Sequence, residues 1–353
     1  MRGTQVARDP VSSNGPEACA DPTAPMELMM LVRAGRVSQS INVAARLGVA
    51  DHLADGPRHI DELAGAVSAH PRALHRLLRL LADFGVFAER EDGRFTLTSL
   101  GELLRSDQER SLRGMVMLLE SRFFRDAWTN LIDAVSTGDA AFDLVHGQQL
   151  FDYLREHPHD AAVFDQGMSD VSRQLTAAIL DVYDFGRFQA VVDVGGGNGA
   201  LLAAILARNP GARGILYDLP DVAARAGVLL AAAGVADRCD VVEGDFFESV
   251  PAGGDAYLLT RIIHDWDDEA ALRILDNCRA AMAGDARLLL GEAVLPEGSE
   301  PSPARLVDIE MLVIGGQERT EAEYRHLFEH VGLRLTRVVP SAGPYDVIEA
   351  VTL

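Results

Sequence analysis

The chain contains few cysteines and no long apolar run. Its three cysteines, Cys19, Cys239 and Cys278, stand far apart among 353 residues, without the paired spacing of a zinc site or a redox motif. No apolar stretch reaches the roughly 20 residues that a membrane-spanning helix needs. We therefore expect reduced thiols, a cytoplasmic location and no membrane partner. Hydrophobic residues make up 48% of the chain, which is enough for a sizeable core.

Positive charge is scarce as well. The chain has 32 Lys and Arg against 53 Asp and Glu, and its formal net charge is -21. Because this charge repels phosphate backbones at long range, the composition disfavours nucleic acid as a partner.

Residues 1–24 are polar and rich in Pro, Ser, Ala and Asp. They lack the basic start and the apolar stretch of a signal peptide, and their composition predicts a disordered tail. The length that remains after this tail allows two domains.

Residues 25–110 have the pattern of a winged-helix module. Pro71 stands at the first turn of an expected helix and Gly85 at its stop, as helix ends prefer. The expected elements are a helical region at 26–55, helices at 60–64 and 71–84, and a hairpin of strands at 86–89 and 94–98. Such a module either binds DNA or mediates dimerisation. The acidity of the chain favours dimerisation, although the longer helix carries three arginines that DNA could contact: Arg72, Arg76 and Arg79.

The pattern of residues 111–185 predicts a helical linker rich in aromatic side chains, which also suits the wall of an apolar substrate pocket. We select Phe142 and Phe151 as candidates for that wall. From 186 to 353, short apolar runs alternate with helices, as in a Rossmann-like, doubly wound α/β sheet. The expected strands are 190–194, 214–217, 239–243, 256–259 and 287–292, followed by an antiparallel closing pair at 331–340 and 347–352.

The most informative stretch is 190–199. A short apolar strand runs into Gly195, Gly197 and Gly199, and a helix-forming run follows at once. This order opens a nucleotide-binding sheet, because glycine lets the backbone turn tightly and lets a ligand approach it. The G-x-G-x-G spacing and the acid Asp193 at the strand end differ from a dinucleotide fold. They suit S-adenosylmethionine, which has no pyrophosphate and carries an ammonium group that needs acceptors.

Polar side chains follow the other expected parallel strands, at the sheet edge where such folds bind ligands. Asp218 ends the second strand and is placed to accept both ribose hydroxyls. Asp245 and Phe246 follow the third strand, where the amino group and ring of an adenine would lie. His264 follows the fourth strand and Glu292 ends the fifth.

His264 is the candidate general base. If the methyl acceptor is a phenol, its unperturbed pKa is near 10, and a neighbouring imidazole is well suited to take its proton. A carboxylate such as Glu292 would fix the tautomer and orientation of the ring. The acids from Asp265 to Asp268 invite a metal-binding interpretation. Because they stand at an expected helix start, where acids favour the helix dipole, we expect no metal site.

Five blocks of the sequence carry a resemblance: DVGGGNG at 193–199, YDLP at 217–220, GDFF at 244–247, IHDWDD at 263–268 and GGQERT at 315–320. Together they resemble the signature blocks of small-molecule O-methyltransferases, the S-adenosylmethionine-dependent enzymes of plant phenolic and bacterial polyketide pathways. The resemblance runs from about residue 26 to the C-terminus. It implies a Rossmann-like catalytic domain and a homodimer held largely by the N-terminal winged-helix module.

The resemblance also implies roles for individual residues. His264 matches the catalytic base, and Glu292 and Glu318 match its flanking acids. Together with the residues chosen above, the expected cofactor contacts are Ser172, which matches a position touching the cofactor carboxylate, and Asp193, Gly195, Gly197, Asp218, Leu219, Asp245, Phe246, Arg261 and Trp266. The expected contacts to the acceptor are Met168, Met311 and, in the same pocket, Asp308.

Two departures limit what carries over. Many plant members have a lysine four residues before the catalytic histidine, where this chain has Thr260 followed by Arg261, so Arg261 is the side chain expected to face the cofactor. The segment from Met311 to Gly316 is shorter than in plant members and lacks their pocket asparagine. Plant phenylpropanoid acceptors are therefore not expected. The chain is more similar to actinobacterial tailoring enzymes, whose usual acceptors are aromatic polyketides, phenazines or similar polycyclic phenols.

The expected function is methylation of a phenolic hydroxyl of an aromatic secondary metabolite, with S-adenosylhomocysteine as the second product. His264 removes the hydroxyl proton, and the oxygen attacks the methyl group in line. Two alternatives stay open. The first is an enzyme of the same fold that binds S-adenosylmethionine but catalyses hydroxylation, decarboxylation or cyclisation. The second is a winged-helix regulator that binds DNA and senses a small molecule, which the net charge and the catalytic residues oppose.

Overall fold

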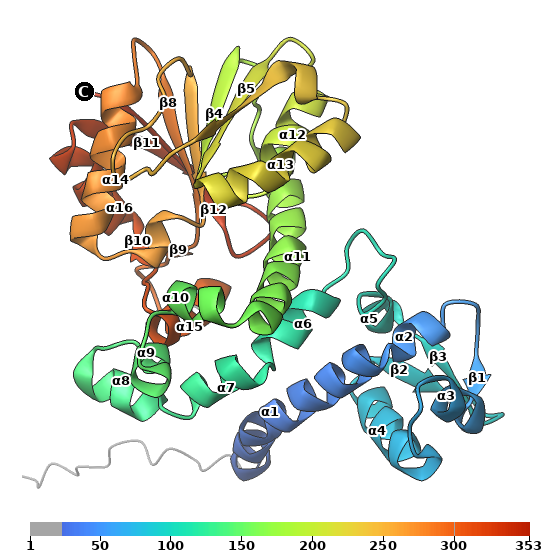
Figure 1. Cartoon of the computed structure of the whole chain (residues 1–353). Helices are drawn as coiled ribbons and strands as arrows, with labels where there is room; N and C mark the ends of the chain where they lie inside the picture. The colour runs from blue at the N-terminus through green and yellow to red at the C-terminus, as the bar shows by residue number, and fades with distance from the viewer. Residues whose placement is uncertain (1–22, 300) are drawn as a thin grey trace, which may run out of the picture.

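The structure is a computed structural model that describes residues 23–299 and 301–353 (Figure 1). Cys19 and nearly all of the predicted tail at 1–24 lie outside the described residues. The first helix, α1 (Ala24–Leu47), begins at the last residue assigned to that tail. None of the described helices is both long enough and apolar enough to cross a membrane.

An N-terminal domain forms around one buried core. Helix α4 (Pro71–Asp83) begins with its proline and ends just before Gly85, whose φ of 72° is a left-handed conformation that side chains disfavour. Its apolar residues recur at helical spacing and are buried in the core. The other helices of this domain are α2 (Val49–His52), α3 (Ile60–Ala66) and α5 (Ser99–Glu102).

The predicted hairpin is confirmed. Strand β2 (Phe87–Glu89) pairs antiparallel with β3 (Arg94–Leu97). A further short strand that the sequence did not predict, β1 (Arg58–His59), pairs with the other edge of β3. The three strands and the preceding helices form the expected winged-helix arrangement.

The first half of α1 projects from the N-terminal domain (Figure 1). Every residue from Thr23 to Arg36 is exposed, whereas Ala44 and Ala45 in the second half are buried. We call residues 24–36 the α1 arm. It exposes a row of large apolar side chains: Met26, Leu28, Met29, Met30, Leu31 and Val32. A monomeric protein rarely presents so many of them together, so the arm has the character of a contact surface.

A helical segment links this domain to the sheet. Helices α6 (Arg113–Leu119), α7 (Arg122–Trp128), α8 (Leu131–Thr137), α9 (Ala141–His146) and α10 (Leu150–Glu156) enclose an aromatic core. Helix α15 (Pro303–Ile314) joins this core from much later in the sequence and contacts α9. The long helix α11 (Pro158–Val182) then runs up to the sheet (Figure 1), where Leu175 and Ile179 are buried.

The C-terminal domain is built on a seven-stranded sheet of order β11-β12-β8-β7-β4-β5-β6. The parallel strands are β4 (Ala190–Val194), β5 (Arg213–Asp218), β6 (Cys239–Glu243), β7 (Ala256–Thr260) and β8 (Arg287–Glu292). β12 (Asp346–Thr352) lies antiparallel to β8, and β11 (Leu333–Val339) antiparallel to β12. The doubly wound sheet and its antiparallel closing pair are therefore confirmed.

Helices cover both faces of the sheet. α14 (Asp268–Ala281) and α16 (Glu321–His330) pack on one face. α12 (Ala200–Arg208), α13 (Pro220–Ala232) and the end of α11 pack on the other. Cys239 and Cys278 are unpaired thiols in these cores. The remaining elements are the 3-10 turns η1 (Ala236–Arg238) and η2 (Ile263–Asp265) and a short parallel pair that was not predicted, β9 (Val294–Leu295) with β10 (Arg319–Thr320).

Candidate active site

A cavity of about 870 Å³ opens at the carboxyl ends of β4, β5 and β7. The strand order turns back between β4 and β7, and ligands of doubly wound sheets bind at that point. Side chains from α10, α11 and α15 form the opposite wall. Ligand pockets usually measure roughly 300–1,000 Å³, so this cavity has room for a nucleoside and an aromatic molecule together.

The glycine loop after β4 forms one side of the cavity. Gly195, Gly197 and Gly199 have φ values of 68°, 61° and 80°, which few residues with a side chain adopt. A Cβ on Gly195 would lie 2.6 Å from the Cδ1 atom of Ile262, whereas a Cβ on Gly197 would meet no atom within 4 Å. Gly197 thus presents bare backbone to the cavity, as a close-fitting ligand requires.

Asp218 ends β5 and lines the cavity. Its Oδ2 accepts a hydrogen bond from the backbone N–H of Gly197 at 2.8 Å, and its Oδ1 accepts one from Leu219 at 2.7 Å. Burial raises the pKa of Asp218, although these two N–H groups lower it. The contacts fix the carboxylate in place, and each oxygen keeps a lone pair for a ligand hydroxyl.

Asp193 lies behind the glycine loop and does not line the cavity. A Cβ on Gly196 would lie 2.7 Å from its carboxyl group. Neither of its oxygens has a hydrogen-bond partner among the described residues. Burial, and then the charge of Asp218, raise the pKa of Asp193 to about 7. A buried carboxylate without a partner favours a cation nearby, and S-adenosylmethionine carries two cationic groups. The bare loop and this acid therefore fit that cofactor.

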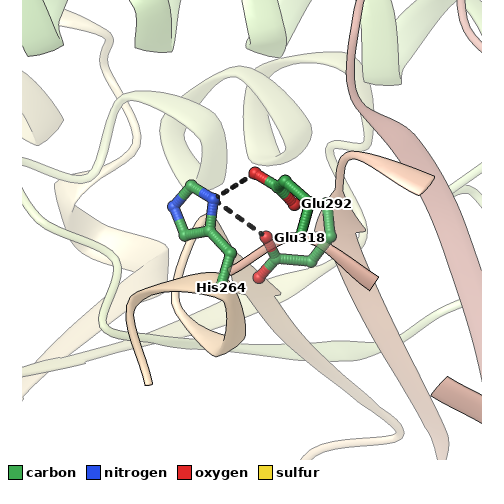
Figure 2. Close-up of side chains that lie close together, drawn as sticks. All are labelled: His264, Glu292 and Glu318. Carbon is green, nitrogen blue, oxygen red and sulfur yellow. Dashed lines mark hydrogen bonds and ion pairs between the residues drawn. The ribbon is translucent and has the colours of Figure 1, made fainter. Parts of the chain in front are cut away.

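His264 lies in η2, directly after β7, and lines the cavity although its side chain is almost fully buried. Its Nδ1 is 2.7 Å from Oε1 of Glu318 and 3.8 Å from Oε2 of Glu292. Figure 2 shows Nδ1 facing both carboxylates while the other ring nitrogen points away from them. That nitrogen, Nε2, has no hydrogen-bond partner among the described residues. A neutral ring that donates Nδ1–H to Glu318 leaves the Nε2 lone pair free to take a proton.

The acids around His264 make its ring a stronger base. Burial lowers the pKa of His264, but the charges of Glu292 and Asp265 and the hydrogen bond to Glu318 outweigh it and raise the pKa to about 9. Burial raises the pKa of Glu292 to about 7 against the opposing effect of His264. The surroundings thus stabilise the protonated imidazole, which is the state of a base that has taken a proton.

Hydrogen bonds that involve backbone groups hold both glutamates in place. Oε1 of Glu292 accepts hydrogen bonds from the backbone N–H groups of Ile262 and Ile263, at 3.0 and 2.9 Å. The backbone N–H of Glu318 donates to Oδ1 of Asp308 at 3.0 Å. Asp308 was predicted to line the acceptor pocket, but it lies outside the cavity lining and supports the Glu318 segment instead.

Arg319 is a supporting residue that sequence reasoning missed. Its side chain is fully buried. It donates to the backbone oxygens of Ile263 and Trp266 at 3.1 and 2.8 Å and pairs with Asp268 at 2.8 Å. It therefore clamps the loop of His264 to the start of α14. The only signal for it was its place beside Glu318 in the block 315–320.

His264, Glu292 and Glu318 also form a group whose ligand atoms lie within 4.8 Å of one another, as a metal site would need. In this structure one nitrogen of the ring and one oxygen of each glutamate are already engaged in hydrogen bonds. Nδ1 of His264 is bonded to Glu318, and Oε1 of Glu292 accepts two backbone N–H groups. The acids that had invited a metal interpretation cap a helix, because Asp267 accepts a hydrogen bond from Ala270 at the start of α14. The absence of a metal stays a prediction.

The wall of the cavity opposite the glycine loop carries many apolar side chains. Met168 from α11, Met311 from α15 and Phe151 from α10 line it, as predicted from the sequence. Phe142 does not. Its ring is fully buried in the linker core, with ring centroids 4.3 Å from His146 and 5.4 Å from Tyr153. Phe142 therefore lies behind the wall and cannot touch a ligand directly, which corrects its selection as an acceptor contact.

The remaining cofactor candidates lie at different depths. Ser172 and Trp266 line the cavity. Phe246 borders the glycine loop, since a Cβ on Gly195 would lie 3.6 Å from its ring. Asp245 next to it accepts a hydrogen bond from the backbone N–H of residue 247 at 2.8 Å. Leu219 is half exposed and outside the cavity lining, so only its backbone, bonded to Asp218, supports the site.

Arg261 lines the cavity but points away from the glycine loop. Its guanidinium carbon lies 5.7 Å from the ring centre of Tyr345, which directly precedes β12. One of its terminal nitrogens is 3.2 Å from the sulfur of Met168. In the sheet, β12 lies beyond β8, on the other side of β7 from β4 and Asp218. Arg261, predicted as a cofactor contact, is thus directed toward Tyr345 and Met168.

Comparison with known proteins places this geometry in a family. Residues 128–334 match the family model of the O-methyltransferase domain, and residues 29–107 match that of the O-methyltransferase dimerisation domain. The phenazine O-methyltransferase of Lysobacter antibioticus is 45% identical over 92% of this chain and 95% of its own. The phenazine-1-carboxylate N-methyltransferase of Pseudomonas aeruginosa is 37% identical over 90% of this chain and 94% of its own.

Solved structures agree with this match. A methyltransferase of calicheamicin biosynthesis, solved in its S-adenosylhomocysteine-bound form, superposes with a TM-score of 0.86 at 37% identity. The match covers 94% of this chain and 99% of that one.

Proposed function

Because this chain belongs to the family of S-adenosylmethionine-dependent O-methyltransferases, we propose that it methylates a phenolic hydroxyl of an aromatic secondary metabolite with His264 as the general base. One observation carries the proposal. His264 lines the cavity, and its Nε2 has no hydrogen-bond partner among the described residues and lies 3.5 Å from Oδ1 of Asp265, while Nδ1 is held by Glu318 at 2.7 Å.

The glycine loop side of the cavity is proposed to hold the cofactor. Gly195 and Gly197 would receive it against bare backbone, and Asp218 would accept its ribose hydroxyls. Ser172 and Trp266, which line the same cavity, would complete the contacts. When bound, S-adenosylmethionine supplies an activated methyl group.

The chain's own contribution to the chemistry is proton removal and positioning. Nε2 of His264 accepts the proton of the acceptor hydroxyl, and the resulting oxygen is a far better nucleophile than the phenol. Glu318 and Glu292 stabilise the imidazolium that forms and keep Nε2 directed at the acceptor. Met168, Met311 and Phe151 would hold the ring of the acceptor so that its oxygen points at the methyl carbon.

Oxygen rather than nitrogen is proposed as the methylated atom. One relative is named an N-methyltransferase and another an O-methyltransferase, both for phenazines. An aromatic ring nitrogen already has a free lone pair and needs no base, whereas a phenol must lose a proton. The buried histidine with two carboxylates favours the phenol.

A homodimer is proposed to form through the α1 arm. The chain has the family's dimerisation domain at 29–107, and the arm exposes six large apolar side chains that nothing in the described chain covers. A second copy would bury them.

The test is a product analysis with matched histidine variants. Purified protein is incubated with S-adenosylmethionine and a panel of hydroxyphenazines and polycyclic phenols, and the masses of the products are determined by mass spectrometry. His264→Ala should lower the methylation rate roughly 10²–10⁴-fold while calorimetric binding of S-adenosylhomocysteine stays nearly unchanged. His326→Ala, an exposed histidine on α16, is the control. A His264→Ala protein with near-normal turnover would overturn the base assignment.

The product masses, together with an NAD-binding measurement and a gel-shift assay, test the cofactor and the two alternatives. A product that gains oxygen or loses carbon dioxide would indicate a non-methylating enzyme of the same fold. Tight binding of NAD instead of S-adenosylhomocysteine would contradict the cofactor. A retained complex in a gel-shift assay at low salt would support a DNA-binding regulator.

A further inference from the structure

Arg261 stands out among the arginines near the site because, among the described residues, no acid pairs with it directly, although the charges of Asp265 and Glu292 act on it from a greater distance. Among residues 23–299 and 301–353, no carboxylate lies within 4 Å of its guanidinium nitrogens, and its Nε atom is buried without a hydrogen bond. By contrast, Arg319 pairs with Asp268, and Arg225, which also lines the cavity, pairs with Asp165 at 3.3 Å. A largely buried guanidinium without a directly paired counter-charge is costly unless a ligand supplies that partner.

The surroundings of Arg261 leave its charge available to the cavity. Its contacts are the ring of Tyr345 and the sulfur of Met168, and neither carries a negative charge. Two acids of the cavity lining, Asp265 and Glu310, interact electrostatically with Arg261, and Glu292 does so from outside the lining. Burial raises the pKa of both lining acids, which disfavours their charged forms, although Arg261 lowers it. An anionic group from a ligand would therefore bind Arg261 without displacing an existing ion pair.

The backbone directs this side chain. Arg261 has a φ of 56°, and it is one of two non-glycine residues with positive φ among the described residues. Its backbone N–H donates to the oxygen of Gly291 in β8 at 3.0 Å. The unusual turn carries the side chain over the end of β8 toward Tyr345, on the same side of β7 as Glu292. Arg261 therefore lies next to His264 and away from the glycine loop.

We propose that Arg261 binds a carboxylate on the acceptor, so that the preferred substrates are hydroxylated aromatic acids. This rests on the proposed function, because it names the substrate class of the same site. The planar fork of arginine matches a carboxylate with two parallel hydrogen bonds, and Met168 and Tyr345 flank the aromatic ring. The carboxylate thereby fixes which edge of the ring faces Nε2 of His264.

The test compares each acid with its neutral amide, so that charge is the main difference. Binding of 3-hydroxy-2-naphthoate and 3-hydroxy-2-naphthamide, and of phenazine-1-carboxylate and phenazine-1-carboxamide, is measured by calorimetry with saturating S-adenosylhomocysteine. We expect each acid to bind about 10- to 100-fold more tightly than its amide, the usual strength of hydrogen bonds to charged groups.

Variants then locate the preference. Arg261→Gln should abolish the ratio between acid and amide, and Arg261→Lys, which keeps the charge but loses the fork, should retain part of it. Arg225→Gln, which changes a cavity arginine that has its own acid, should leave the ratio unchanged. Thermal unfolding checks that each variant is folded.

Three results would overturn the proposal: equal binding of acid and amide by the unmodified protein, a preference that survives Arg261→Gln, or a loss of S-adenosylhomocysteine affinity in Arg261→Gln comparable to the loss of acid binding. The last would assign Arg261 to the cofactor. Failure of the proposed function has a different signature, namely no binding of S-adenosylhomocysteine by the unmodified protein.

Discussion

Replacing Glu318 by glutamine changes the charge next to His264 with almost no change in shape. The side-chain oxygen of glutamine can still accept the Nδ1–H hydrogen bond that spans 2.7 Å in the structure. The negative charge, one of three that raise the pKa of His264 to about 9, is lost. A hydrogen bond to a charged group is worth roughly 1.5–3 kcal/mol, so the imidazolium should become about 10- to 100-fold less stable.

The sign of the effect on the pH profile follows from this. The base is active when neutral, so the methylation rate of the unmodified enzyme should rise with pH and level off above the pKa of His264. In Glu318→Gln the pKa of His264 falls, so the profile should level off at a pH lower by roughly one to two units. The weaker base also makes the plateau lower. The loss in rate should therefore be small near pH 7 and large above pH 9.

The assay measures initial rates of methylated product from pH 6.5 to 10 with saturating S-adenosylmethionine. Glu321→Gln is the matched control, because Glu321 is half exposed and pairs with Arg325 on the surface of α16. Bound cofactor adds positive charge and lowers the midpoint in every protein, so the comparison uses the difference between variants. Parallel profiles for Glu318→Gln and the unmodified enzyme would refute the view that Glu318 tunes His264.

Four further outcomes are expected. Asp193→Asn should reduce the loss of thermal stability expected of the free protein as pH rises from about 4 to 7, because the raised pKa of Asp193 makes its neutral form the stabilising one and ionisation removes that contribution. Glu292, whose pKa is also raised, keeps its own share of the loss. An unchanged pH dependence of Tm would contradict this. Gly197→Ala should lower Tm, since a Cβ at φ 61° costs the folded loop roughly 1–2 kcal/mol, and should weaken S-adenosylhomocysteine binding, because the Cβ would occupy the cavity beside the loop. Gly211→Ala, which has open space and no positive φ, should do neither. Arg319→Lys should lower kcat and Tm with little change in cofactor affinity, because lysine cannot hold two carbonyls and a carboxylate at once. Equal losses of kcat and cofactor affinity would argue against a positioning role. Leu31→Glu should turn the dimer into monomers in light scattering, and a dimer that persists would exclude the α1 arm as its interface.

The parts of the site that follow strands were predictable from the sequence. The apolar run before Gly195 and the acid of Asp218 lie at strand ends, and parallel strands bring their carboxyl ends to one edge. His264 and Glu292 were found by the same logic. Glu318 came only from the family resemblance, because it lies 54 residues from His264 in the sequence, beyond any local periodicity.

Side-chain direction was the main limit. Phe142 and Phe151 both stand in short helices, but the sequence does not show which helix face meets the cavity, and only Phe151 does. Arg261 was assigned to the cofactor because its neighbour matches a plant lysine; its positive φ, which sends the side chain toward Tyr345, has no sequence signal in a residue other than glycine. Asp308 is a similar case, since its partner is a backbone N–H of a distant segment.

Helix α11 ties the two halves of the cavity together. This continuous helix of 25 residues places two residues in the lining of one cavity: Met168, which is proposed to contact the acceptor, and Ser172, one turn later, which is proposed to contact the cofactor. Its near end packs on α6 and its far end is buried against the sheet. A shift of this helix that improves one contact necessarily moves the other. The two ligands should therefore change each other's affinity by the same factor, whichever binds first.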